Sequence, residues 1–283
     1  MDVSRANLQS QIKDVAEIES GWHVIRLQQV HNLAQTFDCP IREVEVTALE
    51  SGVAPWRYLR NLGTVGIEGQ IKLLRATAAV VGLGGLGGYV VEALARVGVG
   101  RLILIDGDIF EEHNLNRQIL SAESRLGTDK VQSACVRVGE INSAVEAIGH
   151  AVSLTPDNLP RLLEGADVVV DGLDRLPTRL TLQEGAQALG IPMVHGSIAG
   201  FLGQVMTIFP NDPGLHSLYG DQDDLPAQGL EVQLGTPPAT PMAVAAWEAQ
   251  EVVKILLNQG QLLRHRLLLM DMESGTIETL QLG

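Results

Sequence analysis

The stretch "TAAVVGLGGLGGYVV", residues 77–91, restricts the fold more than any other part of the chain. A short apolar run enters a glycine-rich turn, and the helix-like segment "GYVVEALARVGV" follows directly. Gly82, Gly84 and Gly87 stand in G-x-G-x-x-G order, which is typical of a nucleotide-binding turn between a strand and a helix. The first glycine permits the tight turn, the second lets phosphates approach the backbone, and the third lets the helix pack closely on the sheet.

The alternation of strand and helix continues to about residue 200. The expected strands are "RLILID", "HAVSL", "DVVVDGL" and "PMVHGS", and the helical segments between them are "DKVQSACVRVGEIN", "NLPRLLEG" and "PTRLTLQEGAQALG". This order predicts an α/β fold with a Rossmann-like, doubly wound, mostly parallel sheet covered on both faces. Beyond it, "GQVMTIF" is strand-like, "PMAVAAWEAQEVVKILLNQG" is a long helix, and two strands around "ESG" close the chain. We expect these C-terminal strands to be antiparallel.

The N-terminal part has a different pattern. The segments "RANLQSQIKDVAEIE", "WHVIRLQQVHNLAQTF" and "IREVEVTALESG" predict an N-terminal helical extension over residues 1–56. The last two segments imitate a helix-turn-helix, but residues 1–56 carry eight acids against four bases, the wrong sign for DNA. Residues 57–283 then form the second unit, with a nucleotide-binding core at about 76–200, a crossover loop at about 211–240, and a C-terminal helix and strands at 241–283.

Charge and composition exclude several partners. There are 34 acidic residues against 20 basic, a formal charge of −14, so broad contact with nucleic acid or anionic lipid is not expected. The longest charge-free run is too short and glycine-rich to span a membrane, and the N-terminus lacks the apolar core of a signal peptide. We therefore expect a cytoplasmic protein without DNA or membrane partners.

A carboxylate follows the glycine loop at the distance that a nucleotide site requires. Asp106 lies nineteen residues beyond Gly87, at the end of "RLILID", where it is suited to accept hydrogen bonds from ribose hydroxyls. This fingerprint suits NAD as well as ATP, so it does not identify the chemistry.

The charged residues at the following strand ends favour a triphosphate. Arg117 and Lys130 supply cations, as cleavage of a triphosphate requires, whereas backbone amides can hold a dinucleotide pyrophosphate. Asp171 and Asp174 in "DVVVDGLD" end the fourth strand at the same edge, where a carboxylate can hold magnesium. The remaining polar side chains in "NLNRQIL", those of Asn114 and Gln118, can add neutral donors.

These motifs together resemble one family. "VVGLGGLGG", "LILIDGD", "NLNRQIL", "GTDKVQSA" and "VVVDGLD" are similar to the E1-like adenylyltransferase family of the HesA, MoeB and ThiF type, which activates ubiquitin-like sulfur-carrier proteins. The likeness runs from about residue 57 to the C-terminus, and the family's "RYxRQ" opening is "RYLRN" in this chain.

The resemblance implies a role for each matching residue. Asp106 would bind the ATP ribose, and Asn114, Arg117 and Lys130 would contact phosphates. Asp174 would hold Mg²⁺, and Arg60 would reach across a homodimer as an arginine finger. The catalytic residues would be Arg60, Arg117, Lys130 and Asp174. The implied nucleotide-binding set is Gly82, Gly84, Gly85, Gly87, Asp106, Asp108, Asn114, Arg117, Gln118, Lys130 and Arg179.

The implied reaction is attack by the C-terminal glycine carboxylate of a carrier ending in Gly-Gly on the α-phosphate of ATP. An acyl-adenylate and pyrophosphate result, in a pathway of the molybdopterin or thiamin type. The carboxylate is already ionised at neutral pH, so no general base is required. His113 and His195 are accordingly expected to be structural or solvated.

The chain also departs from the family pattern. Its only cysteines are Cys39 and Cys135, so the cysteine pairs that bind structural zinc in many relatives are missing and no zinc is expected. Residues 211–240 contain no cysteine, which predicts adenylation without an enzyme thioester, and Cys135 is expected to be a packing residue. Arg175 stands where the family has an asparagine.

Three other functions remain open on sequence alone. An E1-like enzyme that adenylates a carboxylate on modified tRNA is compatible with the missing zinc cysteines. A non-catalytic E1-like scaffold would use the extension and the acidic surface. An NAD-dependent dehydrogenase has no support beyond the glycine loop.

Overall fold

One eight-stranded sheet forms the frame of the molecule. The structure, a computed structural model, describes residues 3–220 and 231–282. The strand order is β11-β10-β9-β8-β7-β4-β5-β6, with β4 to β8 parallel and β9, β10 and β11 antiparallel to their neighbours. The predicted doubly wound, mostly parallel sheet with antiparallel C-terminal strands is confirmed. The strands are β4 (Thr77–Val81), β5 (Arg101–Ile105), β6 (Glu146–His150), β7 (Val168–Asp171), β8 (Met193–Ala199), β9 (Leu202–Ile208), β10 (Arg266–Asp271) and β11 (Thr276–Gln281).

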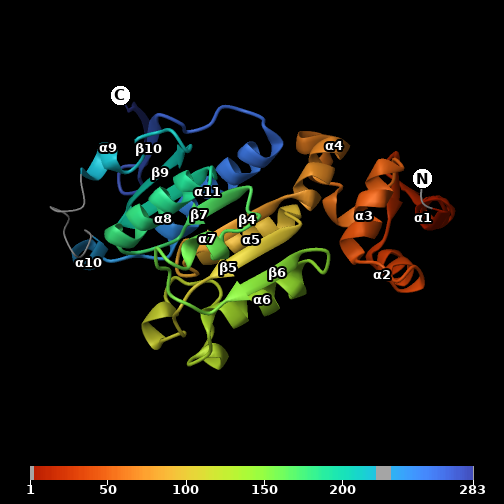
Figure 1. Ribbon diagram of the computed structural model, residues 1–283, viewed down its shortest axis with the longest axis horizontal. Helices are drawn as coiled ribbons and strands as arrows, with labels where there is room; N and C mark the ends of the chain where they lie inside the picture. The colour runs from red at the N-terminus through yellow and green to blue at the C-terminus, as the bar shows by residue number, and fades with distance from the viewer. Residues whose placement is uncertain (1–2, 221–230, 283) are drawn as a thin grey trace.

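Helices cover both faces of this sheet, because the interior strands are apolar on both sides. Ala78 and Val80 of β4 pack into one core cluster with residues of α5, α6 and α11, whereas Ala79 and Val81 pack into a second cluster with residues of α7 and α8. Figure 1 shows the resulting three layers. The helices are α5 (Gly87–Val97), α6 (Lys130–Ile141), α7 (Leu159–Leu162), α8 (Leu176–Ala188) and α11 (Ala239–Leu257).

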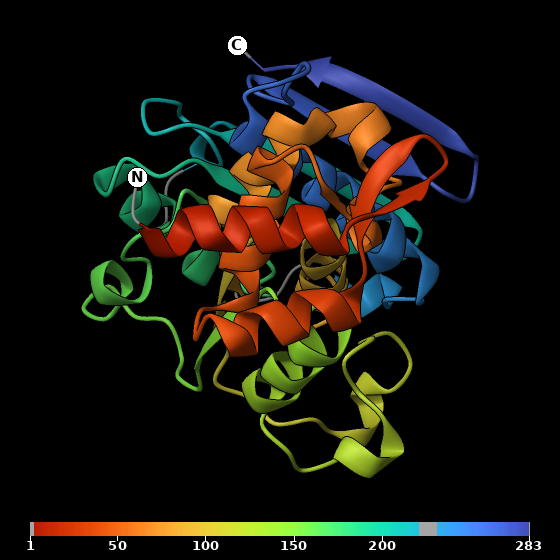
Figure 2. The same ribbon diagram turned by 90° about the vertical axis from the view of Figure 1, so that its right-hand side faces the viewer.

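The N-terminal residues form a small unit with an apolar core of its own, and a further buried apolar cluster joins this unit to Tyr58, Leu62 and Leu74. The unit consists of α1 (Val3–Val15), β1 (Glu17–Glu19), β2 (Trp22–Ile25), α2 (Leu27–Thr36), α3 (Ile41–Glu50) and β3 (Ala54–Pro55), and its strands form a three-stranded sheet in the order β1-β2-β3. Figure 2 looks onto this unit and shows α1 across its outer side. The turn η1 (Trp56–Tyr58) and the helix α4 (Leu62–Arg75) then lead into the large sheet.

The predicted helix over "WHVIRLQQVHNLAQTF" is wrong in its first part. Trp22–Ile25 is the strand β2, and the helix α2 begins only at Leu27. Ser20 and Gly21 have φ values of +50° and +82°, so they form a two-residue turn that pairs β1 with β2 as a hairpin. Two consecutive positive φ values are typical of the turns whose twist matches paired strands. The extension is therefore mixed helix and strand.

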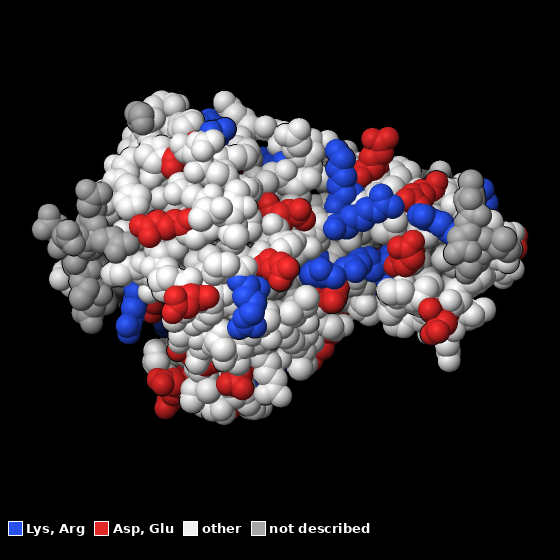
Figure 3. All heavy atoms as spheres, in the orientation of Figure 1, with Lys and Arg blue, Asp and Glu red and all other residues white. Residues whose placement is uncertain are grey.

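Ion pairs join the N-terminal unit to the large sheet. Glu50 of α3 accepts from both Arg5 and Arg75 at 2.5 Å, and Glu146 of β6 lies 3.6 Å from Arg42 and 3.0 Å from Arg101. Figure 3 shows basic side chains gathered on this face where the two units meet. Each glutamate thus links two arginines across or beside the junction, within a chain that is acidic overall.

The structure corrects the position of one predicted strand and describes only part of the predicted crossover loop. The strand predicted at "HAVSL" is wrong in position, since β6 runs over Glu146–His150 in parallel register with β5. In the crossover loop, residues 221–230 lie outside the described residues, and the flanking parts contain the short helices α9 (His216–Tyr219) and α10 (Glu231–Leu234). The turns η2 (Glu112–Asn114) and η3 (Glu123–Arg125) precede α6. Among the helices of residues 3–220 and 231–282, none is both long and apolar enough to cross a bilayer.

Candidate functional site

Two glycine turns meet where the strand order reverses. From β4 the chain continues to β5 and β6 on one side, and it returns to β7 and β8 on the other. Gly82 after β4 has a φ of +89°, and a Cβ atom placed on it would lie 2.5 Å from the carbonyl oxygen of Gly172 after β7. Only glycine allows this approach, and ligands of open α/β sheets bind at such a crevice.

Of the remaining glycines of the loop, one allows close packing and two line the cavity. A Cβ on Gly87 would overlap the carbonyl oxygen of Gly82, so Gly87 serves the close contact of α5 with the turn. Gly84 and Gly85 line the cavity instead. Their added Cβ atoms would lie 3.6 Å from Gln118 Nε2 and from Arg117 Cγ, respectively. The bare backbone at these positions is therefore accessible to a ligand held by those two side chains.

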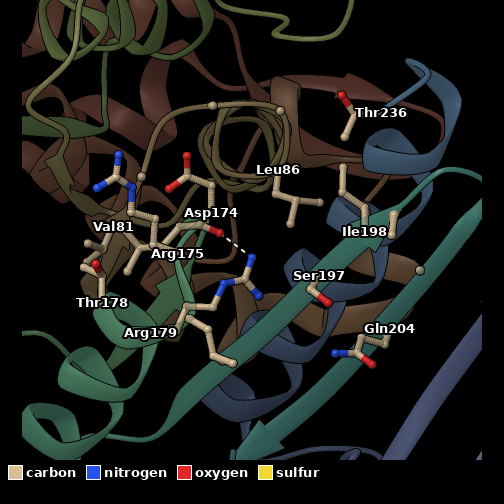
Figure 4. A pocket seen from close by; sticks show the side chains of 18 of the residues that line it. Val81, Leu86, Asp174, Arg175, Thr178, Arg179, Ser197, Ile198, Gln204 and Thr236 are labelled. Atoms are coloured by element: carbon tan, nitrogen blue, oxygen red, sulfur yellow. Dashed lines mark hydrogen bonds between the residues drawn. The ribbon is translucent and has the colours of Figure 1, made fainter. Parts of the chain in front are cut away.

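A cavity of about 1570 Å³ opens above these turns. Figure 4 shows Asp174 and Arg175 on one side of it and Ser197, Ile198 and Gln204, from β8 and β9, on the other. Ligand pockets for small molecules measure roughly 300–1,000 Å³, so this cavity has room for a nucleotide and part of a second molecule. Its polar lining includes Asp106, Asp108, Arg117, Gln118, Lys130, Ser153, Asp174, Arg175, Thr178, Arg179, Ser197, Gln204 and Tyr219.

Asp106 lies at the end of β5, as the sequence predicted. Its Oδ2 accepts from the amide of Leu83 at 2.7 Å, and its Oδ1 accepts from the amide of Asp108 at 2.8 Å. Burial raises the pKa of Asp106, although Lys130 and the two amides oppose that shift. The carboxylate is thus fixed to the glycine loop and faces the cavity, where each oxygen keeps lone pairs for a ligand's hydroxyl groups.

The two predicted cations also line this cavity. Arg117 donates to the carbonyl oxygen of His113 at 3.0 Å and to Asn116 Oδ1 at 2.8 Å. Burial lowers the pKa of Arg117, and the charge of Asp174 partly offsets this. Lys130 is 6% exposed at the start of α6, and its Nζ lies 2.9 Å from Asp108 Oδ2. Both side chains are held in place by the protein before any ligand binds.

The amides of "NLNRQIL" have different positions. Gln118 lines the cavity, and its buried Oε1 has no hydrogen-bond partner among the described residues. Asn114 is 4% exposed and is not among the lining residues. Its Oδ1 accepts from the amide of Glu111 at 2.9 Å, so it stabilises the turn η2 that leads to Arg117.

Only one of the two predicted aspartates at the end of β7 can reach a ligand. Asp171 is fully buried and lies 2.7 Å from His195 Nδ1, so of the two aspartates at this strand end it is not the one available to a metal. Asp174 is exposed and lines the cavity. Its carboxylate forms no hydrogen bond or ion pair with any described residue, although its charge acts on Arg117.

This arrangement suits a magnesium ion that arrives with phosphates rather than a resident metal. Within the described residues, no group of three or more His, Cys, Asp or Glu side chains could hold a metal. Mg²⁺ is commonly bound by one or two carboxylates together with substrate phosphates. Asp174, which lines the same cavity as Gly84 and Gly85, fits that pattern.

Arg179 also lines the cavity, but its guanidinium donates to backbone carbonyl oxygens of the protein. It is 7% exposed, and its Nη2 donates to the carbonyl oxygen of Leu173, the bond drawn in Figure 4. Its Nη1 donates to the carbonyl oxygen of Gly196 at 3.0 Å and lies 3.8 Å from Asp171 Oδ2. The guanidinium is therefore occupied by the protein itself.

Sequence reasoning missed the buried acid beneath this arginine. Glu248 of α11 is fully buried, and neither carboxylate oxygen has a hydrogen-bond partner among the described residues. Burial and the nearby charge of Asp171 raise the pKa of Glu248 well above its usual value. The available signal was an acid within the largely apolar helix "AVAAWEAQEVV".

The predicted arginine finger is not part of the cavity of its own chain. Arg60 is exposed, follows the turn η1, and is not among the residues that line the cavity. The histidines meet the expectation of a structural or solvated role, because His195 is buried against Asp171 and His113 is exposed.

Comparison with known proteins shows to which family the chain belongs. The sequence profile of the ThiF family matches residues 58–283. The chain belongs to the ThiF family. It is 37% identical over 228 residues to the SAMP-activating enzyme E1 of Haloferax volcanii, covering 79% of this chain and 83% of that protein. It is 35% identical over 239 residues to the adenylyltransferase and sulfurtransferase MOCS3 of Aedes aegypti, covering 80% of this chain and 52% of that protein.

The ThiF-family assignment agrees with the fold. The chain matches the structure of E. coli MccB with ATP at a TM-score of 0.67 and 20% identity, covering 90% of this chain and 82% of that chain. It matches PaaA at a TM-score of 0.68 and 19% identity, covering 80% and 73%. The chain spans about half the length of the Aedes MOCS3 protein. The predicted E1-like adenylyltransferase family is confirmed.

Proposed function

We propose that this ThiF-family chain uses ATP to adenylate the C-terminal glycine carboxylate of a ubiquitin-like sulfur-carrier protein. One observation carries the proposal: Arg117, Lys130 and Asp174 line the same cavity, directly above the glycine loop. The names of the curated relatives, a SAMP-activating E1 and an adenylyltransferase and sulfurtransferase, support activation of a small carrier. The product is an acyl-adenylate, and no enzyme thioester forms.

The chain's residues would act by positioning and by electrostatic stabilisation. Asp106 accepts hydrogen bonds from the ribose, and the bare backbone at Gly84 and Gly85 receives the phosphates. A carboxylate oxygen of the carrier forms a bond to the α-phosphorus, the bond to the pyrophosphate breaks, and Arg117 and Lys130 stabilise the departing charge. Mg²⁺, held by Asp174 and the phosphates, supplies further neutralisation when bound.

The carrier end of the site is lined by apolar and neutral polar residues on β8 and β9, whereas Asp271 and Glu278 line it farther out, on β10 and β11. On the side of β8 and β9, the cavity is lined by Ile198, Ala199 and Leu202, with Gln204 and Tyr219 joined by a hydrogen bond of 2.5 Å. An extended Gly-Gly tail has no side chains, so it fits a channel that offers apolar walls and few polar contacts. We propose that the tail enters along these strands and places its carboxylate between Arg117 and the nucleotide.

The decisive experiment is ATP–pyrophosphate exchange with purified candidates. Carriers ending in Gly-Gly should stimulate exchange, and the same carriers without the last glycine should not. Stimulation by modified tRNA alone would replace the proposal with a tRNA-adenylating enzyme. Silence with every carrier and tRNA would leave a non-catalytic scaffold.

Two substitutions test the residues that carry the proposal. Arg117→Ala and Asp174→Asn should each lower carrier-stimulated exchange by about 10²–10³, the usual effect of removing one stabilising group from a preorganised site. Arg161→Ala and Asp157→Asn are matched controls, because both residues are exposed and neither lines the cavity. Equal exchange in Arg117→Ala and Arg161→Ala would contradict the assignment.

A further inference from the structure

The turn that carries Asp174 is held from both sides of one peptide unit. The amide of Leu173 donates to Asp171 Oδ1 at 3.0 Å, and the carbonyl oxygen of Leu173 accepts from Arg179 Nη2. Gly172, which precedes it, packs so closely on the glycine loop that an added Cβ would lie 2.5 Å from Gly82 O. The backbone immediately before Asp174 is therefore fixed by Asp171, which is fully buried, and by Arg179, which is 7% exposed.

Arg179 is itself anchored to the neighbouring strand. Its Nη1 donates to the carbonyl oxygen of Gly196 in β8 at 3.0 Å, so the guanidinium bridges β8 and the turn after β7. Only a planar group with several fixed donors can satisfy two carbonyl oxygens in this way. A lysine has one ammonium group and cannot span both.

The charges beneath the turn balance without any ligand. Burial opposes ionisation of Asp171, but Arg179 and His195 outweigh it and keep its pKa below the usual value. Burial lowers the pKa of His195, which as a neutral ring donates from Nδ1 to Asp171. Glu248 keeps its proton for the reasons given above. One negative and one positive group remain, which is the stable arrangement in a dry interior.

We propose that Arg179 is a positioning residue that fixes the turn bearing Asp174 for magnesium binding and does not itself bind the nucleotide. Asp174 forms no hydrogen bond or ion pair with a described residue, so the position of its carboxylate depends on the backbone that Arg179 and Asp171 hold. This inference rests on the proposed function for the role of Asp174. The contacts of Arg179 and Asp171 with Leu173, which we call the clamp, hold the turn in the ligand-free chain.

The experiment compares variants that break the clamp in different ways. Arg179→Lys keeps the charge beside Asp171 and loses one of the two carbonyl contacts. The double variant Arg179→Met with Asp171→Asn removes both charges together, so it avoids an unpaired buried charge that could prevent folding. Glu248→Gln is the control, because a neutral amide replaces a group that is already neutral. Arg117→Ala supplies the contrasting behaviour of a direct phosphate ligand.

Two measurements decide the outcome. In the ligand-free protein, amide hydrogen exchange of a peptide covering residues 172–176 should be about tenfold faster in both clamp variants and unchanged in Glu248→Gln. In calorimetric titration, ATP without Mg²⁺ should bind the clamp variants as it binds wild type, while the gain in affinity from Mg²⁺ should fall by about 10–100-fold.

Two results would overturn the inference. Unchanged hydrogen exchange overturns the clamp. Loss of Mg²⁺-free ATP binding in Arg179→Lys, as in Arg117→Ala, makes Arg179 a nucleotide ligand and overturns the inference. If wild type binds no ATP at all, the proposed function fails, and hydrogen exchange still tests whether Arg179 fixes the turn.

Discussion

Glu45 shows how one buried acid connects the two units of the chain. It is fully buried on α3 and accepts from the hydroxyl group of Tyr58 at 3.0 Å, while Arg57 Nε lies 3.3 Å from its other oxygen. Asn142, at the end of α6, donates to the same Tyr58 oxygen at 2.8 Å and to the carbonyl oxygen of Ala95 at 3.0 Å. Arg57 and Tyr58 open the "RYLRN" segment, so this network holds the residues that precede Arg60.

This network predicts a pH-dependent stability. Burial raises the pKa of Glu45 from 4.5 to about 7, because Arg57 and Tyr58 only partly compensate the lost hydration. A raised acid pKa means that the folded state binds more protons than the unfolded state between these values, so this group lowers the free energy of unfolding as pH rises through that window. Glu45→Gln should remove up to about 3 kcal/mol of that decline.

Urea unfolding at about pH 4 and about pH 8, below and above this window, provides the measurement. Glu43→Gln on the same helix is the control, since Glu43 is exposed. A pH dependence in Glu45→Gln equal to that of wild type would show that Glu45 ionises normally in the folded chain.

For single residues, the sequence predicted which charged side chains stand near the site, but not which of them are buried or what they contact. Asp171 and Asp174 both follow the same strand, and nothing in "DVVVDGLD" shows that the first is buried against His195 while the second is exposed. Arg179 was expected among the nucleotide ligands because the family resemblance implied it. Its direction is decided by the carbonyl oxygen of Gly196, which comes from another strand.

At the scale of elements, the glycine loop is the part that tolerates least change. Gly82→Ala would combine a φ of +89° with a Cβ atom 2.5 Å from a carbonyl oxygen. We expect a loss of about 1–3 kcal/mol in the free energy of unfolding. We also expect weaker ATP binding, because the two glycine turns at β4 and β7 would be forced apart. Denaturant unfolding and calorimetric ATP titration measure the two effects.

Gly139 on α6 is the matched control. It lies in a helix, and a Cβ placed there has no atom within 4 Å. Gly139→Ala should therefore raise the free energy of unfolding by up to about 1 kcal/mol and leave ATP binding unchanged. If Gly82→Ala behaved in the same way, the close approach of the turns would not be essential.

The elements of the large sheet were predictable because their strands are buried on both faces. "TAAVV" and "RLILI" are continuous apolar runs, and the helices between them are long enough to show their own period. The hairpin β1–β2 was missed because strands of three and four residues show no readable alternation. In the edge strand β6, "EAIGH", every residue is exposed or only partly buried. The apolar pattern of this strand in the sequence is therefore weak.

For the whole molecule, we propose that Arg60 acts in the cavity of a second copy of the chain. It is exposed in its own chain and is not among the cavity-lining residues, so a role in catalysis requires the partner's cavity. We expect Arg60→Ala and Asp174→Asn to be inactive alone and to regain activity when co-expressed. A heterodimer of the two has one intact site, and random pairing gives about a quarter of wild-type exchange.

Sedimentation at the assay concentration establishes whether the mixed sample is dimeric. No recovery in a dimeric mixture would show that Arg60 does not act across the interface. Recovery also by Arg117→Ala mixed with Asp174→Asn, two residues of the same cavity, would point to subunit rearrangement rather than a finger in trans.

The contact between β8 and α11 has an evolutionary consequence. Gly196 lies so close to Glu248 that an added Cβ would be 2.5 Å from the carboxylate. Homologues that keep an acid on the helix must keep a bare backbone opposite it, whereas those with a shorter residue there are free to gain a side chain on the strand. Positions 196 and 248 should therefore covary, and ancestral reconstruction should find them exchanged as a pair.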